Sequence, residues 1–165
     1  MTDESILVRL FEHNNWANSR MIEVCAGLCD EQLDAEPRSA TLGSIRQTLI
    51  HLVRSQQGYL AILTLPVESR PQITLEFDDL GEVARQSGEV LLALAGDQAS
   101  PQPRPRLRTR DGYFVEPWVV MLQVINHAGE HREQISSMLT DLGVTPPELD
   151  GWSYGEAASA LVPPD

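Results

Sequence analysis

The chain has 165 residues with 24 acidic and 12 basic side chains, so its net charge is −12, and every basic residue is an arginine. Such an acidic surface repels phosphate backbones, which excludes a general nucleic-acid-binding protein. No stretch approaches the ~20 consecutive apolar residues of a membrane-spanning helix, and the acidic start does not resemble a signal peptide. A length of 165 residues suits one domain, and an apolar fraction of 42% is enough for a buried core. We therefore expect a single domain over residues 1–165. Without a signal peptide or a membrane-spanning helix, we expect it in the cytoplasm.

The first predicted helix starts close to the N-terminus, where Thr2 or Asp3 can cap it. Apolar residues at helical spacing mark its inward face: Ile6, Leu10, Ala17, Met21, Val24 and Leu28. A second helix begins at Ser44, which forms a capping-box pattern with Gln47, and it stops before Pro66.

Residues 68–77 contain Pro71 and predict a crossover connection to a third helix over residues 79–95. Alternating residues on both sides of Asp111-Gly112 predict a β-hairpin. A fourth helix begins at Pro117 and continues to Leu142, and the tail has room for one short helix. These elements predict an all-α fold: a four-helix bundle with a long crossover between helices 2 and 3 and a small β-hairpin before helix 4.

Four arginines, a third of the basic residues, gather on or near the predicted hairpin: Arg104, Arg106, Arg108 and Arg110. Two interpretations are open. The arginines form a solvated strand face that balances the acidic remainder of the chain, or they form a rim that recognises anions. On the second interpretation, Arg106 and Arg108 are the candidate anion-binding residues.

His127 and His131 lie four residues apart in the fourth helix, so their imidazoles project from one side of it, one turn apart. A helix offers two ligands to one metal ion in this way, although the pair alone is weak evidence. His51 lies in an almost wholly apolar part of the second helix, where a buried imidazole needs a partner. A shared metal ion satisfies all three rings. Alternatively, each ring bonds separately to a carbonyl or carboxylate group.

Four segments resemble, in their order along the chain, the motifs of the DinB/YfiT-like family: Leu10–Asn18, Ser44–Leu52, Asn126–His131 and Leu149–Gly155. Each motif is loose, but the ordered set covers most of the chain. The resemblance implies a four-helix bundle with a long crossover between helices two and three. It also implies a divalent metal ion held by one histidine of helix two and two of helix four, which correspond to His51, His127 and His131.

His13 departs from the family pattern, which often has a tyrosine at this position on the inward face of helix one. Three roles are open for His13: a fourth metal ligand, a proton shuttle near the metal, or a core histidine bonded to another protein group. The proton shuttle is its candidate catalytic role.

Three neutral imidazoles leave the charge of a divalent ion uncompensated and at least one coordination position open. Such an ion lowers the pKa of bound water or binds a thiol as thiolate. Since relatives in the family include thiol-dependent transferases and isomerases, the resemblance implies a metal-dependent hydrolase or thiol-dependent transferase acting on a small molecule. Zinc or nickel suits the ligands, and a low-molecular-weight thiol is the expected second cofactor. The alternative is a non-catalytic, metal- or small-ligand-binding stress-response protein.

We also expect a homodimer. Phe11, Ile22 and Cys25 lie off the predicted inward face of the first helix, and a second copy of the chain can cover such excess apolar surface. The family resemblance implies the same.

Overall fold

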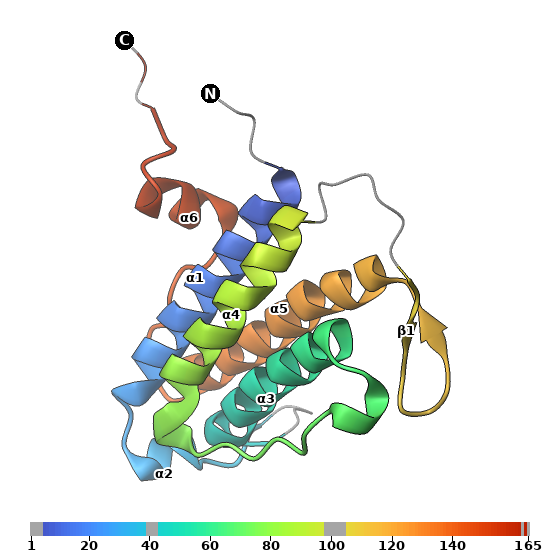
Figure 1. Cartoon of the computed structure of the whole chain (residues 1–165). Helices are drawn as coiled ribbons and strands as arrows, with labels where there is room; N and C mark the ends of the chain where they lie inside the picture. The colour runs from blue at the N-terminus through green and yellow to red at the C-terminus, as the bar shows by residue number, and fades with distance from the viewer. Residues whose placement is uncertain (1–4, 39–42, 98–104, 163, 165) are drawn as a thin grey trace.

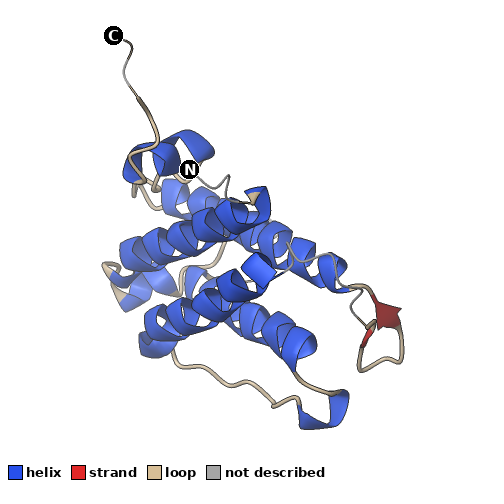
Figure 2. Ribbon diagram, turned by 45° about the horizontal axis from the view of Figure 1, so that its top comes forward, coloured by secondary structure: helices blue, strands red, loops and turns tan. Residues whose placement is uncertain are grey.

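The structure, a computed structural model, describes residues 5–38, 43–97, 105–162 and 164, and it confirms the all-α bundle (Figure 1; Figure 2). Its four long helices are α1 (Ile6–Ala26), α3 (Ile45–Thr64), α4 (Leu80–Asp97) and α5 (Pro117–Asp141). They are the four helices expected from the sequence, with ends displaced by a few residues at most.

Shorter elements connect or extend the bundle: α2 (Asp30–Leu33), η1 (Val67–Ser69), η2 (Phe77–Asp79), β1 (Leu107–Arg108), β2 (Phe114–Val115) and α6 (Gly151–Ala157). The strands pair antiparallel, with Leu107 opposite Val115. Gly112 in the turn has a φ of 93°, a backbone conformation that favours glycine. The predicted small hairpin is therefore present, and it stands at one end of the bundle (Figure 2).

Local capping explains where two of the long helices begin. The Ser44 hydroxyl accepts a bond from the Gln47 amide at 3.3 Å, and the Gln47 side chain accepts one from the Ser44 amide at 3.1 Å. This reciprocal pair satisfies two amides that have no partner inside α3. Pro117 occupies the first turn of α5, where a missing N–H costs nothing.

The long crossover lies between α3 and α4. Residues 66–79 return the chain to the end of the bundle where α3 starts, so α3 and α4 run in the same direction (Figure 1). Both α1 and α3 pack against α4 and α5. As a result, α3 and α5, which carry the three candidate metal ligands, are direct neighbours.

Two apolar clusters fill the core, one toward each end of the bundle. One includes Met21, Leu49, Leu80, Ile135 and Leu139, and the other includes Phe11, Leu91, Ala95, Met121 and Val124. Because α1, α4 and α5 contribute buried residues to both clusters, and partly buried residues of α3 pack against the second, the apolar core extends along the bundle. This burial supplies the main driving force for folding.

A buried polar layer separates the two clusters and joins all four long helices. From α5, Arg132 donates to the side-chain oxygens of Asn14 and Asn18 on α1, at 2.9 and 2.6 Å. Asn18 donates to Gln56 on α3 at 3.0 Å, and Gln56 donates to the Ser87 hydroxyl on α4 at 2.7 Å. Buried polar groups of this kind fix the register of helices, since each loses much if its partner shifts.

The predicted inward face of the first helix is partly wrong. Ile6 and Leu10 are 74% and 42% exposed, whereas Phe11, Ile22 and Cys25 are 0%, 9% and 0% exposed. The physical reason is that α1 packs against α4, α5 and α6, so its buried arc is wider than one stripe and differently oriented. The three residues expected at a dimer interface are thus buried within the chain itself and cannot form that interface.

No helix in the described part of the chain combines the length and apolarity needed to cross a lipid bilayer.

Candidate metal centre

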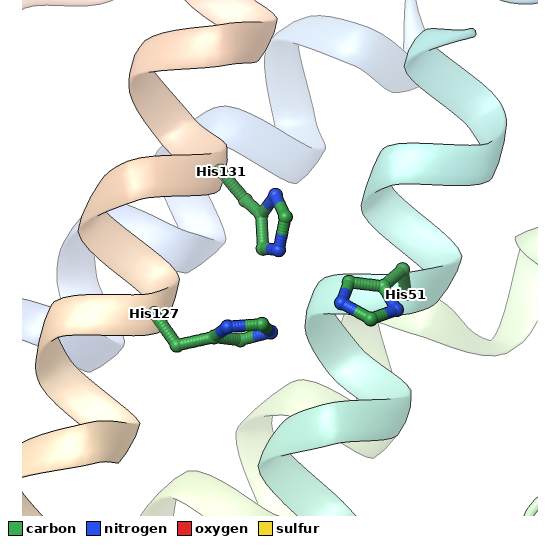
Figure 3. A group of neighbouring side chains, drawn as sticks. All are labelled: His51, His127 and His131. Carbon is green, nitrogen blue, oxygen red and sulfur yellow. The ribbon is translucent and has the colours of Figure 1, made fainter. Parts of the chain in front are cut away.

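Three imidazoles meet between α3 and α5. His51 projects from α3, and His127 and His131 project from successive turns of α5 toward it (Figure 3). One nitrogen from each ring lies within 4.8 Å of the other two. The ring centroids are 5.0 Å apart for His51 and His127, 4.7 Å for His51 and His131, and 4.3 Å for His127 and His131. In the part of the chain that the structure describes, no carboxylate or thiol joins this group.

The three rings of the cluster differ in their hydrogen bonds, and a short one orients His131. The Nδ1 atom of His131 lies 2.9 Å from the side-chain oxygen of Gln134. Because that oxygen only accepts, Nδ1 carries the proton and Nε2 keeps its lone pair. The Nε2 atom of His127 is buried and has no hydrogen-bond partner among the described residues. His51 makes a long contact of 3.5 Å between Nε2 and the Ser55 hydroxyl.

The electrostatics of the cluster favour neutral rings. Burial, together with the positive charge that His131, His127 and Arg54 can carry beside it, lowers the pKa of His51 to about 4. Burial and the adjacent His131 also lower the pKa of His127. Both rings are therefore neutral at pH 7, the form in which imidazole binds a metal ion.

The three residues fit a divalent metal ion. Zinc binds imidazole nitrogen at ~2.0–2.1 Å, which spaces tetrahedral ligands about 3.4 Å apart. The three imidazoles each place a nitrogen within 4.8 Å of the other two, the range in which one ion can be shared. The buried, unpartnered Nε2 of His127 is the kind of atom that a metal ion would satisfy, since leaving it unpaired costs free energy.

An open pocket lies beside the cluster and includes His51 in its wall. Its volume is about 580 Å³, and its walls come from α3, the crossover and the hairpin. This volume is within the range of small-molecule sites. Tyr59 also lines the pocket, and its ring lies edge-on to His127 with centroids 5.6 Å apart.

The arginines of the hairpin are divided between two places. Arg106 pairs with Glu116 at 2.6 Å and, with Arg108, lines a different depression from the pocket that contains His51. Arg110 lines the His51 pocket instead. Arg104 lies outside the described residues. The structure thus brings a hairpin arginine to the pocket, but it is neither of the two chosen from the sequence.

His13 lies against the C-terminal tail and is not a member of the histidine cluster. Its Nε2 atom is 2.7 Å from the carbonyl oxygen of Leu149, so Nε2 carries the proton of this bond. Its ring also contacts Trp16 and Tyr154, with centroids 5.9 and 5.5 Å away. These contacts correspond to the third role left open by the sequence, a histidine bonded to a protein group.

Several residues beside the cluster were not singled out from the sequence. His51, Ser55 and Tyr59 are spaced four residues apart on α3, a signal that they share one helix face. Arg54 and Arg70 also line the pocket. No local pattern identifies Arg70, or shows which of the hairpin arginines reaches the pocket, because the crossover and the hairpin meet only through the tertiary fold.

Comparison with known proteins identifies the family. The family model for the DinB family matches residues 1–164. The chain belongs to the DinB family. A crystal structure of a DinB-like protein from Bacillus cereus ATCC 10987 is similar to it, with a TM-score of 0.62 and 17% sequence identity over 86% of this chain and 94% of that chain. At this identity the likeness shows the shared fold. No curated protein matches the chain.

Family membership and the histidine cluster agree with one another. In this chain α3 packs against α5. That packing brings His51 together with His127 and His131, which lie 76 and 80 positions further along the sequence. A metal-binding DinB-family protein fits these observations.

Proposed function

We propose that this DinB-family protein is a divalent-metal-dependent enzyme that activates water or a low-molecular-weight thiol at His51, His127 and His131. Its reaction class is hydrolysis or thiol-dependent group transfer on a small molecule. The single observation that carries the proposal is the group of three imidazoles with nitrogens within 4.8 Å of one another. The pocket beside His51 supports catalysis because a substrate has room to approach.

The residues of the site have distinct roles in this proposal. His51, His127 and His131 would hold the ion, and Gln134 fixes the tautomer of His131 through Nδ1. A bound divalent ion would supply Lewis acidity, which lowers the pKa of a water or thiol in contact with it. We propose zinc or nickel, since both suit imidazole ligands. Tyr59 borders both the pocket and His127, so it would contact a substrate there.

The second candidate is a non-catalytic metal- or ligand-binding stress-response protein, in which the ion only fastens α3 to α5. A closed structural site has four protein ligands. The group of possible ligands found among the described residues has three members, and His13 bonds to Leu149 instead. This arrangement supports an open site over a structural one.

Two further expectations remain proposals. A cytoplasmic location is supported by Cys25 and Cys29, which are both free thiols, as is usual in reducing compartments. A homodimer, if formed, would use surface other than Phe11, Ile22 and Cys25. Light scattering at micromolar concentrations tests it, and a monomer throughout that range would rule it out.

Metal analysis of the purified protein, followed by activity screens, tests the function. We expect one divalent ion per chain, and we expect azide to bind the ion at its open coordination position. We also expect thiol-transfer or hydrolytic activity that is lost when a chelator removes the ion. His51→Ala should lose both metal and activity. An ion that accepts no exogenous ligand, in a protein inactive in both screens, would favour the non-catalytic alternative.

A further inference from the structure

The pocket beside the histidine cluster has an unusual charge for this protein. Three guanidinium groups line it, from Arg54 on α3, Arg70 in the crossover and Arg110 at the hairpin. One carboxylate, that of Asp111, lines it as well. The chain as a whole carries a net charge of −12, so a pocket with three positive groups and one negative group is a local reversal of sign.

None of these three arginines forms an ion pair with a carboxylate of the described residues. By contrast, five arginines outside the pocket do form such pairs: Arg9, Arg20, Arg46, Arg85 and Arg106. With 24 acidic residues in the chain, carboxylates are abundant. Half of the described arginines that lack such a pair thus line this one pocket, where a ligand has space.

Hydrogen bonds hold two of the pocket arginines in place while leaving donors free. Arg110 donates from Nη2 to the carbonyl oxygens of Arg70 and Pro71, at 2.9 and 3.4 Å, which ties the hairpin to the crossover. Arg70 donates from Nε to the carbonyl of Leu65 at 3.1 Å, and its buried Nη1 has no partner within the described ranges of the chain. The exposed Arg54 has no hydrogen bond among the described residues. Neutral carbonyls cancel none of the positive charge, so the pocket stays cationic.

We propose that this pocket binds the carboxylate or phosphate group of a small molecule whose other end reaches the three-histidine cluster. The inference rests on the proposed function and names the substrate class for that site. Guanidinium groups suit such ligands because their donors match two oxygens at once. Arg54 is one helical turn from His51, so an anion at Arg54 orients the remainder of the ligand along the pocket toward the histidines.

Binding of three small thiols to the cobalt-loaded protein tests the inference. The probes are mercaptopropionate, mercaptoethyl phosphate and the neutral mercaptopropanol, and the readout is the charge-transfer absorption of thiolate bound to cobalt. We expect at least one acidic probe to bind about tenfold or more tightly than the alcohol, as one charge-assisted hydrogen bond provides. The acid that binds more tightly identifies carboxylate or phosphate as the preferred group.

Substitutions of single arginines locate the anion. Arg54→Gln and Arg70→Gln should each weaken binding of the preferred acid about tenfold and leave the alcohol unchanged. Arg85→Gln is the matched control, because it removes the same charge from α4, outside the pocket, and should change neither. Arg54→Gln carries the test even if Arg70→Gln fails to fold, since Arg54 is exposed and makes no bond that the fold needs.

The outcomes separate this inference from the proposed function. Equal affinities for acids and alcohol in the cobalt-loaded protein would overturn the inference and leave the metal site intact. Failure to bind cobalt would contradict the proposed function. In that case, calorimetric titration of the metal-free chain with the same acids still decides the matter: binding that Arg54→Gln weakens supports the pocket, and no binding overturns it.

Discussion

At the scale of single residues, the Nε2 atom of His127 offers the most direct test of the metal site. It is buried without a partner and belongs to the three-histidine group. We expect His127→Ala to abolish stoichiometric zinc binding, because two imidazoles rarely hold a labile divalent ion. His13→Ala is the matched control and should keep one ion per chain, since His13 bonds to Leu149. Isothermal titration measures both, and full metal content in His127→Ala would contradict the assignment.

Cys25 gives a prediction about pH. Burial raises the pKa of its thiol from the ordinary 9.0 to about 12. Above pH 9 the unfolded chain releases this proton while the folded chain keeps it, so the contribution of Cys25 to the free energy of unfolding should fall as pH rises from 9 toward 12. The full loss is on the order of 4 kcal/mol. Urea unfolding at a series of pH values measures it. Cys25→Ala should flatten the alkaline decline, whereas Cys29→Ala, at an exposed thiol, should not.

At the scale of helices, Gly88 allows α1 and α4 to approach closely. Asn15 on α1 donates to the Gly88 carbonyl at 2.9 Å, and a Cβ at residue 88 would lie 2.7 Å from the Asn15 side-chain oxygen. We expect Gly88→Ala to lower the free energy of unfolding by roughly 1–3 kcal/mol through this steric conflict. Gly58→Ala, where nothing lies within 4 Å, should instead raise it by up to ~1 kcal/mol. Denaturant titration measures the free energy of unfolding of both variants. Equal changes in the two would contradict the steric conflict between residue 88 and Asn15.

Arg132 tests the polar layer that joins the four helices. Its pKa is lowered by burial to about 10, so it remains charged at neutral pH and bonds to Asn14 and Asn18. Arg132→Met would leave two buried amide oxygens unpaired, and we expect it to cost about 2–4 kcal/mol in urea unfolding. The exposed Arg85 pairs with Glu82 and Glu89 on its own helix. Arg85→Met should therefore cost less than ~1 kcal/mol, and similar losses for both would argue against a structural role for the layer.

How far the sequence predicts this structure depends on whether a signal is local. Ser44 and Pro117 give the starts of α3 and α5 because capping and proline geometry act within one turn. The spacing of His127 and His131, with an imidazole in the apolar run around His51, predicts a common site. The exposure of Leu10 and the burial of Phe11 depend on which helices cover α1. The hydrogen bond from Arg110 to the Arg70 carbonyl joins the hairpin to the crossover. No sequence pattern predicts that these two segments lie side by side.

At the scale of the whole molecule, the core is built separately from the histidine cluster. Two apolar clusters and a buried polar layer span the four long helices, and none of these contacts needs a metal ion. In small zinc domains the ion supplies the folding energy, and chelation unfolds them. Here we expect the chelated protein to stay folded at room temperature.

Thermal melting with and without chelator measures this difference. Binding to the folded state alone stabilises it by ~4 kcal/mol when free metal is about 1,000-fold above the dissociation constant. Removal of the ion should therefore lower the melting temperature while the metal-free chain still melts cooperatively, with helical circular dichroism unchanged before the transition. His127→Ala, which lacks a ligand, should melt at the same temperature with and without chelator. Loss of helical signal at room temperature on chelation would mean that the ion holds the bundle together, and the site would then be structural.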